Sequence, residues 1–188
     1  MVSFHSIIES VAPLSAESQE ALLLLATEVS FSRGHHLFEA GKTDRNVYFL
    51  IKGIARAYCY SEDTELTFWF GSEGNVVLSY NSYVYRKPGY EHIELLEDAI
   101  LYQVPGDALE TLYNQHIDMA NWGRKLAEQE LIKTEERFIS RQFRTAAERY
   151  TELLQQTPEL LQRVQLGHIA SYLGVTQVTL SRIRAAIR

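Results

Sequence analysis

The residues of this chain best suited to chemistry are the arginines near its carboxyl end. From residue 141 onward there are seven basic and three acidic residues, a net charge of +4, whereas residues 1–140 hold 11 basic and 21 acidic residues, a net charge of −10. All seven basic residues are arginine: Arg141, Arg144, Arg149, Arg163, Arg182, Arg184 and Arg188. A guanidinium group makes paired hydrogen bonds to phosphate and to guanine. The asymmetry predicts that this part binds nucleic acid, although the acidic chain as a whole is unsuited to indiscriminate polyanion binding.

Two short helical patterns on either side of Gly174 would position the last of these arginines. The first pattern has one apolar face, formed by Leu166, Ile169, Ala170 and Leu173. The second can be capped by Thr176, and its inner face is formed by Thr179, Leu180, Ile183 and Ala186 or Ile187. Gly174 stands where the first helix must end and the chain reverse, a position that favours positive φ. The spacing predicts a helix-turn-helix, and an ordinary helical hairpin that caps a core has the same spacing.

Composition limits the class of protein. The 188 residues are enough for one large core or two modest ones, and 46% of them are hydrophobic, as in globular proteins. The longest strongly apolar run, residues 21–26, is too short to span a bilayer, and the first residues lack the pattern of a secretion signal. Cys59 is the only cysteine, which excludes an internal disulfide and a four-cysteine metal or iron–sulfur site. We therefore expect a cytoplasmic protein without membrane contact.

The part before the arginine-rich end begins with helix and continues with strands. Residues 3–29 are predicted as helix, with serines suitable for capping. Short runs of β-branched and aromatic residues then predict strands at Val29–Ser32, His36–Glu39, Val47–Lys52, Ile54–Tyr60, Glu65–Phe70, Val76–Ser79, Glu91–Leu96 and Ala99–Val104. Ser61–Thr64 is expected to be a hairpin connection. About eight strands within roughly 75 residues are typical of a jelly roll or small barrel.

Helical patterns return after Pro105 and continue to the end. They predict segments at 107–116, 117–142 and 145–155, the last opening with a capping box, and a short turn with proline at its first position, Pro158. The long helix over 117–142 has more apolar surface than the barrel easily covers. It is therefore predicted to pair with its copy in a second subunit, and packing on the barrel is the alternative. A hinge at Arg141–Arg144 divides the chain into predicted domains 1–142 and 143–188.

Taken together, this order of elements resembles the Crp/Fnr family of bacterial transcription regulators over nearly the whole chain. The residues that carry the resemblance are Glu39–Gly41, Val47–Gly53, Glu73–Asn75, Ile169–Thr176 and Leu180–Ile183. The resemblance implies an α+β fold: a cyclic nucleotide-binding-like double-stranded β-helix (jelly roll) with flanking helices, a long dimerisation helix, and a carboxyl-terminal helix-turn-helix domain. It also implies double-stranded DNA as a partner and a homodimer formed through 117–142. The sequence departs from the family after Arg188, where the family places a wing hairpin that contacts phosphates.

The resemblance implies a recognition helix that contacts DNA through six residues: Thr176, Gln177, Val178, Thr179, Ser181 and Arg182. Of these, Gln177, Val178 and Arg182 take the positions that face base edges, whereas Thr179 and Ser181 lie near the DNA backbone. Arg182 could read guanine, Gln177 adenine, and Val178 a thymine methyl group. The best-known members have arginine and glutamate at the first two base-facing positions, so the DNA target must differ from that of the cyclic-AMP receptor protein.

The segment that holds cyclic nucleotide in the family is altered here. Members that bind the nucleotide have a glycine and a glutamate after one strand and an arginine that opens the next. Here Leu78 and Ser79 replace the first two, and Gly89 stands at the arginine position, with Arg86 three residues away. We therefore predict that cyclic AMP does not bind, that there is no cofactor, and that the effector is of an unknown class. The remaining candidate pocket is formed by Leu78, Ser79, Tyr80 and Arg86. Neighbouring tyrosines either bind an unknown ligand or pack the wall: Tyr80, Tyr83, Tyr85 and Tyr90.

Catalytic motifs are absent from the sequence. There is no Gly-rich phosphate loop, HExxH or GxSxG motif, and no set of nucleophile, base and orienting residue. His35 and His36 would point to opposite faces of a strand and cannot bind one metal ion. His92 could ligate a haem inside the roll, as in some family members, or simply pack there. Three acidic residues are predicted to form a solvated hairpin face: Glu94, Glu97 and Asp98.

These observations predict a homodimeric DNA-binding transcription regulator whose roll senses something other than cyclic AMP. Two alternatives belong to other classes. One is a ligand-binding or protein-interaction module of the same fold that no longer binds DNA. The other is a small-molecule enzyme built on the barrel, for which the sequence offers no catalytic residues, so we expect that the protein is not an enzyme.

Overall fold

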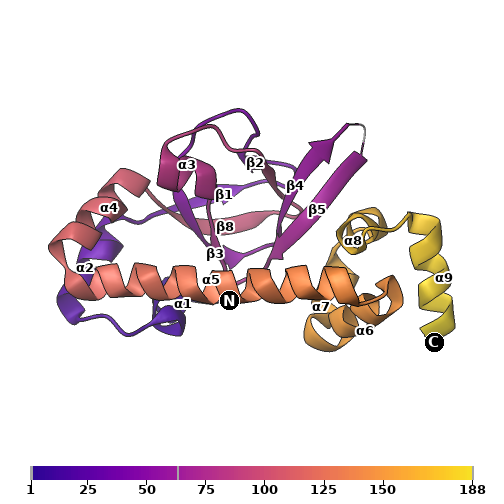
Figure 1. Cartoon of the computed structure of the whole chain (residues 1–188). Helices are drawn as coiled ribbons and strands as arrows, with labels where there is room; N and C mark the ends of the chain where they lie inside the picture. The colour runs from indigo at the N-terminus through magenta and orange to yellow at the C-terminus, as the bar shows by residue number, and fades with distance from the viewer. Residues whose placement is uncertain (1, 63, 188) are drawn as a thin grey trace. The chain divides into compact units, whose positions relative to one another are not determined.

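The structure, a computed structural model, describes residues 2–62 and 64–187 (Figure 1). Two positions named above lie outside the described residues: Asp63, in the predicted hairpin connection, and Arg188, in the basic set. The chain separates into two compact units, Met1–Ala57 with Phe70–Gln129, and Tyr58–Trp69 with Glu130–Arg188. The predicted division into a sensor domain, 1–142, and a DNA-binding domain, 143–188, is a division by function and stays a proposal.

Two four-stranded sheets form a jelly roll. Their strand orders are β1-β8-β3-β6 and β2-β7-β4-β5, and β8 pairs antiparallel with both β1 and β3. The strands are β1 (Thr27–Phe31), β2 (His36–Phe38), β3 (Val47–Lys52), β4 (Ala55–Ser61), β5 (Thr64–Gly71), β6 (Val76–Val77), β7 (His92–Leu95) and β8 (Ala99–Val104). The predicted α+β class and jelly roll are therefore confirmed, and β3 and β8 have the predicted bounds.

The predicted helix over residues 3–29 is wrong. Helix α1 (Phe4–Val11) ends before Pro13, and a second helix, α2 (Ala16–Leu25), follows before the chain enters β1. Proline disfavours the helical conformation of the residue before it and has no N–H to donate, so the helix is interrupted there. Ser15 caps α2 by accepting a hydrogen bond from the Ser18 N–H, which makes Ser15 the start of a new helix rather than part of a continuous one.

The first unit positions the beginning of α5 (Ile117–Phe143) through its amino-terminal helices. Trp122 is fully buried, and its indole N–H donates to the Ile8 carbonyl oxygen at 2.9 Å. The Asp118 carboxylate accepts hydrogen bonds from the Ser15 N–H at 2.9 Å and the Ser18 hydroxyl at 2.7 Å. The Ser15 N–H above all holds the pKa of Asp118 well below its usual range. Helix α3 (Tyr80–Tyr85) follows β6, and α4 (Gly106–Gln115) precedes α5.

The second unit contains four helices of the carboxyl-terminal part: α6 (Ala146–Gln156), α7 (Pro158–Arg163), α8 (Leu166–Leu173) and α9 (Gln177–Ile187). The predicted capping box is confirmed, since the side chains of Thr145 and Glu148 each accept the other's backbone N–H. Proline at the start of α7 and a positive φ of 67° at Gly174 are confirmed as well. In the described part of the chain, no helix has the length and apolar character that crossing a membrane requires.

Candidate functional site

The six predicted DNA-binding residues lie at the amino-terminal end of α9, and all of them are exposed. The Thr176 hydroxyl accepts a hydrogen bond from the Thr179 N–H at 3.2 Å, so Thr176 caps the helix. Leu180 is fully buried and holds α9 against the unit, with Ile183 half-buried beside it. The predicted inner face was partly wrong, because Thr179 and Ile187 are exposed. A narrower buried face leaves more of α9 open to solvent.

The turn between α8 and α9 is fixed by its backbone and by Arg149. The Val175 N–H donates to the Ala170 carbonyl at 3.0 Å, and Gly174 has the left-handed conformation that ends many helices. Arg149 of α6 donates to the Leu173 carbonyl at 2.6 Å and to the Arg144 carbonyl at 2.5 Å. Arg149 is thereby committed to binding the carboxyl ends of two helices.

The arginines of the basic set therefore differ in their surroundings. Arg144 forms an ion pair with Glu152 at 2.7 Å, and Arg149 binds backbone carbonyls. By contrast, the Arg182 side chain is exposed and has no hydrogen bond or ion pair to the described residues. Charge counting alone had treated these arginines as equivalent. Arg182 is the one that combines exposure with a position on the predicted recognition helix.

A contact with β5 inside the second unit was not predicted. The Ser171 hydroxyl of α8 accepts a hydrogen bond from the Thr67 N–H at 2.8 Å and donates to the Glu65 carbonyl at 2.9 Å. One side chain thus completes two backbone groups of a strand at the edge of its sheet. The only signal in the sequence is a serine next to buried Ala170, which does not reveal a partner about a hundred positions away.

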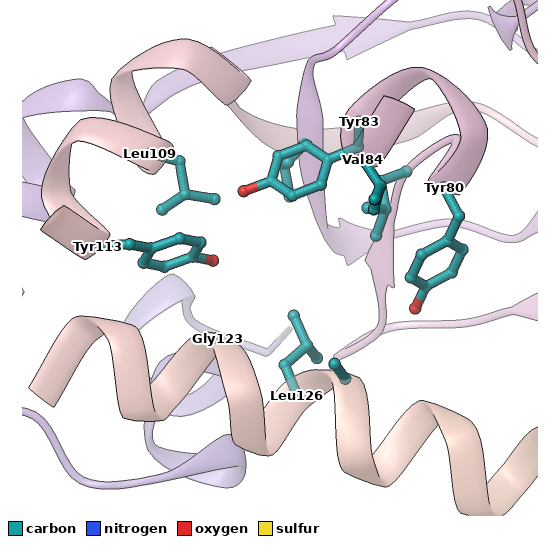
Figure 2. A pocket seen from close by; sticks show the side chains of 10 residues that line it. Tyr80, Tyr83, Val84, Leu109, Tyr113, Gly123 and Leu126 are labelled. Carbon is teal, nitrogen blue, oxygen red and sulfur yellow. The ribbon is translucent and has the colours of Figure 1, made fainter. Parts of the chain in front are cut away.

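The first unit contains a cavity of about 120 Å³ between α3, α4 and α5 (Figure 2). Of the predicted pocket residues, Leu78 and Tyr80 line it, whereas Ser79 and Arg86 do not. Ser79 is buried elsewhere, where its hydroxyl donates to the Ser82 hydroxyl at 3.3 Å. The four neighbouring tyrosines differ in position. Tyr83 lines the cavity with Tyr80, whereas the side chains of Tyr85 and Tyr90 are exposed and lie outside it. Most of the residues missed by sequence reasoning, above all Tyr113, come from α4 and α5, and Val47 and Val84 come from β3 and α3.

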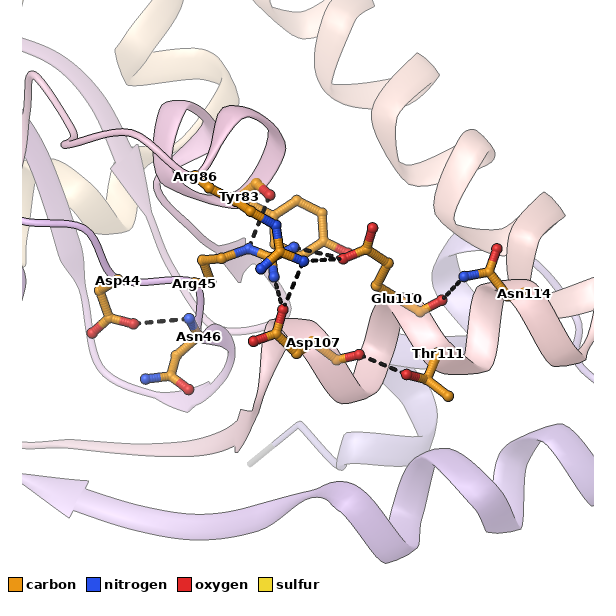
Figure 3. A network of polar contacts seen from close by, with 9 residues as sticks. All are labelled: Asp44, Arg45, Asn46, Tyr83, Arg86, Asp107, Glu110, Thr111 and Asn114. Carbon is orange, nitrogen blue, oxygen red and sulfur yellow. Dashed lines mark hydrogen bonds and ion pairs between the residues drawn. The ribbon is translucent and has the colours of Figure 1, made fainter.

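Arg86 belongs instead to a network of two arginines and two carboxylates (Figure 3). Arg86 lies 3.0 Å from the Asp107 carboxylate and 3.1 Å from that of Glu110. Arg45 pairs with the same two carboxylates, and its Nη2 donates to Glu110 at 2.8 Å. The Arg45 hydrogen bond is the chief reason that the pKa of Glu110 lies below its usual value. Both guanidinium groups near the altered cassette are therefore already neutralised by carboxylates.

At Gly89, predicted from the sequence to take the place of an arginine in the resembled family, a side chain would crowd the Ser79 hydroxyl. A Cβ atom there would lie 2.7 Å from the Ser79 hydroxyl and 3.5 Å from the carboxylate oxygens of Glu91. Glu91 is itself 4% exposed, and its carboxylate accepts a hydrogen bond from the Tyr90 N–H. The Gly89 backbone is paired with the loop that contains Gly41, through an N–H···O distance of 2.9 Å. A buried carboxylate thus lies beside Gly89.

The predicted solvated acidic face is wrong for Glu94. Its carboxylate accepts hydrogen bonds from Arg56 at 2.8 Å and 2.7 Å, and the Arg56 side chain is only 3% exposed. Asp98 accepts the Arg33 N–H at 2.9 Å. The ring of His92 lies edge-on to that of His36, with centroids 5.8 Å apart. Among the described residues there is no group of three side chains of the kinds that commonly bind metal ions.

Comparison with known proteins adds three similar folds and one family model. Residues 28–116 match the model of the cyclic nucleotide-binding domain. FixK2 from Bradyrhizobium japonicum is 23% identical, with a TM-score of 0.75 over 86% of this chain and 84% of that one. CLP of Xanthomonas campestris, a c-di-GMP responsive global regulator, is 16% identical, with a TM-score of 0.73 over 92% and 91% of the two chains.

The catabolite activator protein of Thermus thermophilus is 17% identical, with a TM-score of 0.60 over 97% of this chain and 86% of that one. No curated protein matches the sequence. At these identities the solved structures establish the fold, and the family model shows that residues 28–116 are similar to a cyclic nucleotide-binding domain.

Proposed function

We propose that the chain is a DNA-binding transcription regulator of the Crp/Fnr type, which acts in the cytoplasm as a homodimer and senses an effector other than cyclic AMP. The observation that carries this proposal is the exposed amino-terminal face of α9, held on the unit by buried Leu180. The fold likeness to three regulators over more than four fifths of their lengths supports it.

On α9, Arg182, Gln177 and Val178 are the proposed base-reading residues, for guanine, adenine and a thymine methyl group respectively. Thr179 and Ser181 are proposed to contact phosphates. The Ser181 hydroxyl donates to the Gln177 carbonyl at 3.0 Å in this structure, so a phosphate contact requires it to turn or to accept a second hydrogen bond. The guanidinium of Arg182 needs no such exchange, which makes it the strongest single contributor.

Dimerisation is proposed through the second half of α5. Large apolar side chains there are 55–84% exposed: Leu131, Ile132, Phe138, Ile139 and Phe143. A row of such residues on one helix is typical of a surface that is covered by a partner. A second copy related by two-fold symmetry would cover it and present two recognition helices about 34 Å apart, one turn of DNA. In the proposed mechanism, effector binding at the roll changes the spacing of those helices through α5.

Phe138→Glu tests this interface, because a buried charge at a dimer contact lacks a partner. We expect the variant to sediment as a monomer at micromolar concentration where the parent is a dimer. Leu24→Glu is the matched control, since Leu24 lies on α2 of the first unit and is 80% exposed. A dimer that survives Phe138→Glu, or that is lost equally in Leu24→Glu, would move the interface elsewhere.

Selection of bound fragments from genomic DNA, followed by binding at several salt concentrations, tests the regulator itself. Phosphate contacts predict a steep loss of affinity with salt. Arg182→Ala should weaken binding to a selected site by ~1–3 kcal/mol and relax the preference at one base pair. Arg124→Ala, an exposed arginine paired with Glu128 on the first half of α5, should leave binding unchanged. Absence of salt-dependent DNA binding would favour the alternative, a ligand-binding or protein-interaction module of the same fold.

A further inference from the structure

The cavity between α3, α4 and α5 is lined by apolar and tyrosine side chains. Leu78, Val84 and Leu109 contribute apolar walls, and none of the described residues that line it is charged. The exposed side chains of Val84 and Tyr80 are at its rim, whereas Leu109 is 1% exposed at its floor. Charged ligands lose their hydration in such a site without gaining a counter-charge, so the lining selects uncharged molecules.

The size of the cavity sets the size of the ligand. A cavity of about 120 Å³ is close to the volume at which an apolar protein cavity accepts a single benzene ring, roughly 150 Å³. A purine ribonucleotide is several times larger than one ring. The volume therefore favours a molecule with one six-membered ring and at most one small substituent.

Two phenol groups give this apolar cavity a polar end. Tyr83 and Tyr113 both line the cavity, and Figure 2 shows their two hydroxyl oxygens directed into the space between the helices. Burial raises the pKa of both phenols, so they stay protonated. Each protonated phenol has one proton to donate and lone pairs with which to accept. The pair can therefore bind one hydroxyl or carbonyl group of a ligand.

The positions of both rings are fixed by their neighbours. Gly123 of α5 makes room for Tyr113, because a Cβ atom there would lie 2.8 Å from the Tyr113 ring. Arg45 donates from Nε to the Tyr83 carbonyl at 3.2 Å, and its guanidinium lies 5.6 Å from the centre of the Tyr83 ring. The polar end is thus held in place by the same Arg45 network that closes α3 onto α4.

From these observations we propose that the cavity binds a small, uncharged, single-ring aromatic molecule with one hydroxyl or carbonyl group, which lies against α5 and hydrogen-bonds to the Tyr83–Tyr113 pair. This assigns a chemical class to the effector and in that respect rests on the proposed function. Binding itself is independent of DNA and is measured without it.

Phenol, benzoate and cyclic AMP are the probes, titrated into the full chain by calorimetry and thermal unfolding. Phenol is expected to bind saturably with one site per chain and to raise the melting temperature. Benzoate has the same ring with a negative charge and is expected to bind at least tenfold more weakly, as is cyclic AMP. Equal binding of phenol and benzoate, or no saturable binding of phenol, would overturn the proposal.

Two substitutions locate the site, and a third is their control. Ala127→Leu adds bulk at a lining position that is exposed on α5, where leucine is a good helix former, and should reduce phenol affinity at least tenfold. Ala147→Leu is the same change on exposed α6 and should leave phenol affinity unaltered. Tyr113→Phe keeps the ring and should weaken phenol roughly threefold to tenfold while leaving benzene binding unchanged. Equal phenol binding in the parent and Ala127→Leu would place the site elsewhere and refute the proposal.

DNA binding is measured on the same samples with and without phenol. Phenol binding without any DNA binding would refute the regulator and leave the ligand site standing. DNA binding without phenol binding would do the reverse, so the two failures are distinguishable.

Discussion

Replacing Arg149 with methionine should destabilise the carboxyl-terminal unit while leaving its DNA contacts in place. The Arg149 guanidinium donates to the carbonyl oxygens of Leu173, at 2.6 Å, and Arg144, at 2.5 Å. These carbonyls belong to the carboxyl ends of helical segments, where backbone acceptors have no intrahelical partner. A longer hydrogen bond from the same guanidinium reaches the Arg141 carbonyl at 3.5 Å. Methionine keeps the alkyl stem of the side chain and removes all of these hydrogen bonds, of which the two short ones contribute most.

The magnitude follows from those two bonds. A hydrogen bond to a charged group contributes about 1.5–3 kcal/mol, and the half-buried position of Arg149 favours the lower end because water can replace part of each bond. We therefore expect a loss of ~2–3 kcal/mol. For a chain of this length, that corresponds to a fall in melting temperature of roughly 4–12 °C.

Two measurements, each at several salt concentrations, separate an arginine that stabilises the fold from one that contacts DNA. They are melting followed by circular dichroism and fluorescence anisotropy with a selected DNA fragment. Arg149→Met should lower the melting temperature and keep the salt dependence of DNA binding. Arg182→Ala should do the opposite: an unchanged melting temperature with an affinity lower by ~1–3 kcal/mol. An Arg149→Met protein that melts like the parent but has a salt slope reduced by about one would mean that Arg149 contacts a phosphate, and the reasoning would be wrong.

Two further predictions concern the first unit. Asp118→Asn should cost about 1 kcal/mol at neutral pH, a value reduced for solvent access, because its charged acceptor for Ser15 and Ser18 is lost. Since the pKa of Asp118 is lowered in the folded protein, this stability is present above the ordinary value of 3.8 and is lost as the pH falls below it; urea titrations from pH 7 to pH 2 should show the parent converging on the variant. Glu94→Ala should cost about 3 kcal/mol because the buried Arg56 guanidinium loses the Glu94 carboxylate, and Arg56→Met with Glu94→Leu should recover most of the loss; a double variant as unstable as the single one would contradict this account.

The sequence predicts the elements whose signals are local. The run at Val47–Lys52 is buried for all but its last residue, so its continuous apolar character locates the strand without any knowledge of its partners. Gly174 ends α8 because a reversal of chain direction needs a left-handed residue, and glycine adopts that conformation without strain. The capping box at Thr145 likewise depends on two residues three positions apart.

What sequence reasoning missed depends on partners that are distant in the chain. The sequence predicts that Glu94 is solvated, because no residue near it in the chain is its counter-ion. Its counter-ion is Arg56, which lies 38 positions away. The sequence does not distinguish the three tyrosines at 80, 83 and 85. The packing of α3 decides which of them line the cavity. The cavity also needs Gly123, whose missing side chain admits an aromatic ring from α4, and single glycines in helices give no such indication beforehand.

The charges around Gly89 and in the Arg45–Arg86 network of the first unit are unfavourable to an anionic ligand. Beside Gly89, Glu91 is a buried carboxylate, and a Cβ atom at Gly89 would lie 2.7 Å from the Ser79 hydroxyl. The nearest exposed guanidinium, Arg86, is held by Asp107 and Glu110, so a phosphate would first have to displace two carboxylates. Such an exchange gains little, since one charge-assisted contact replaces another while the released carboxylates must be solvated again. An uncharged ligand meets none of these costs, and the apolar lining of the cavity favours the same class of molecule.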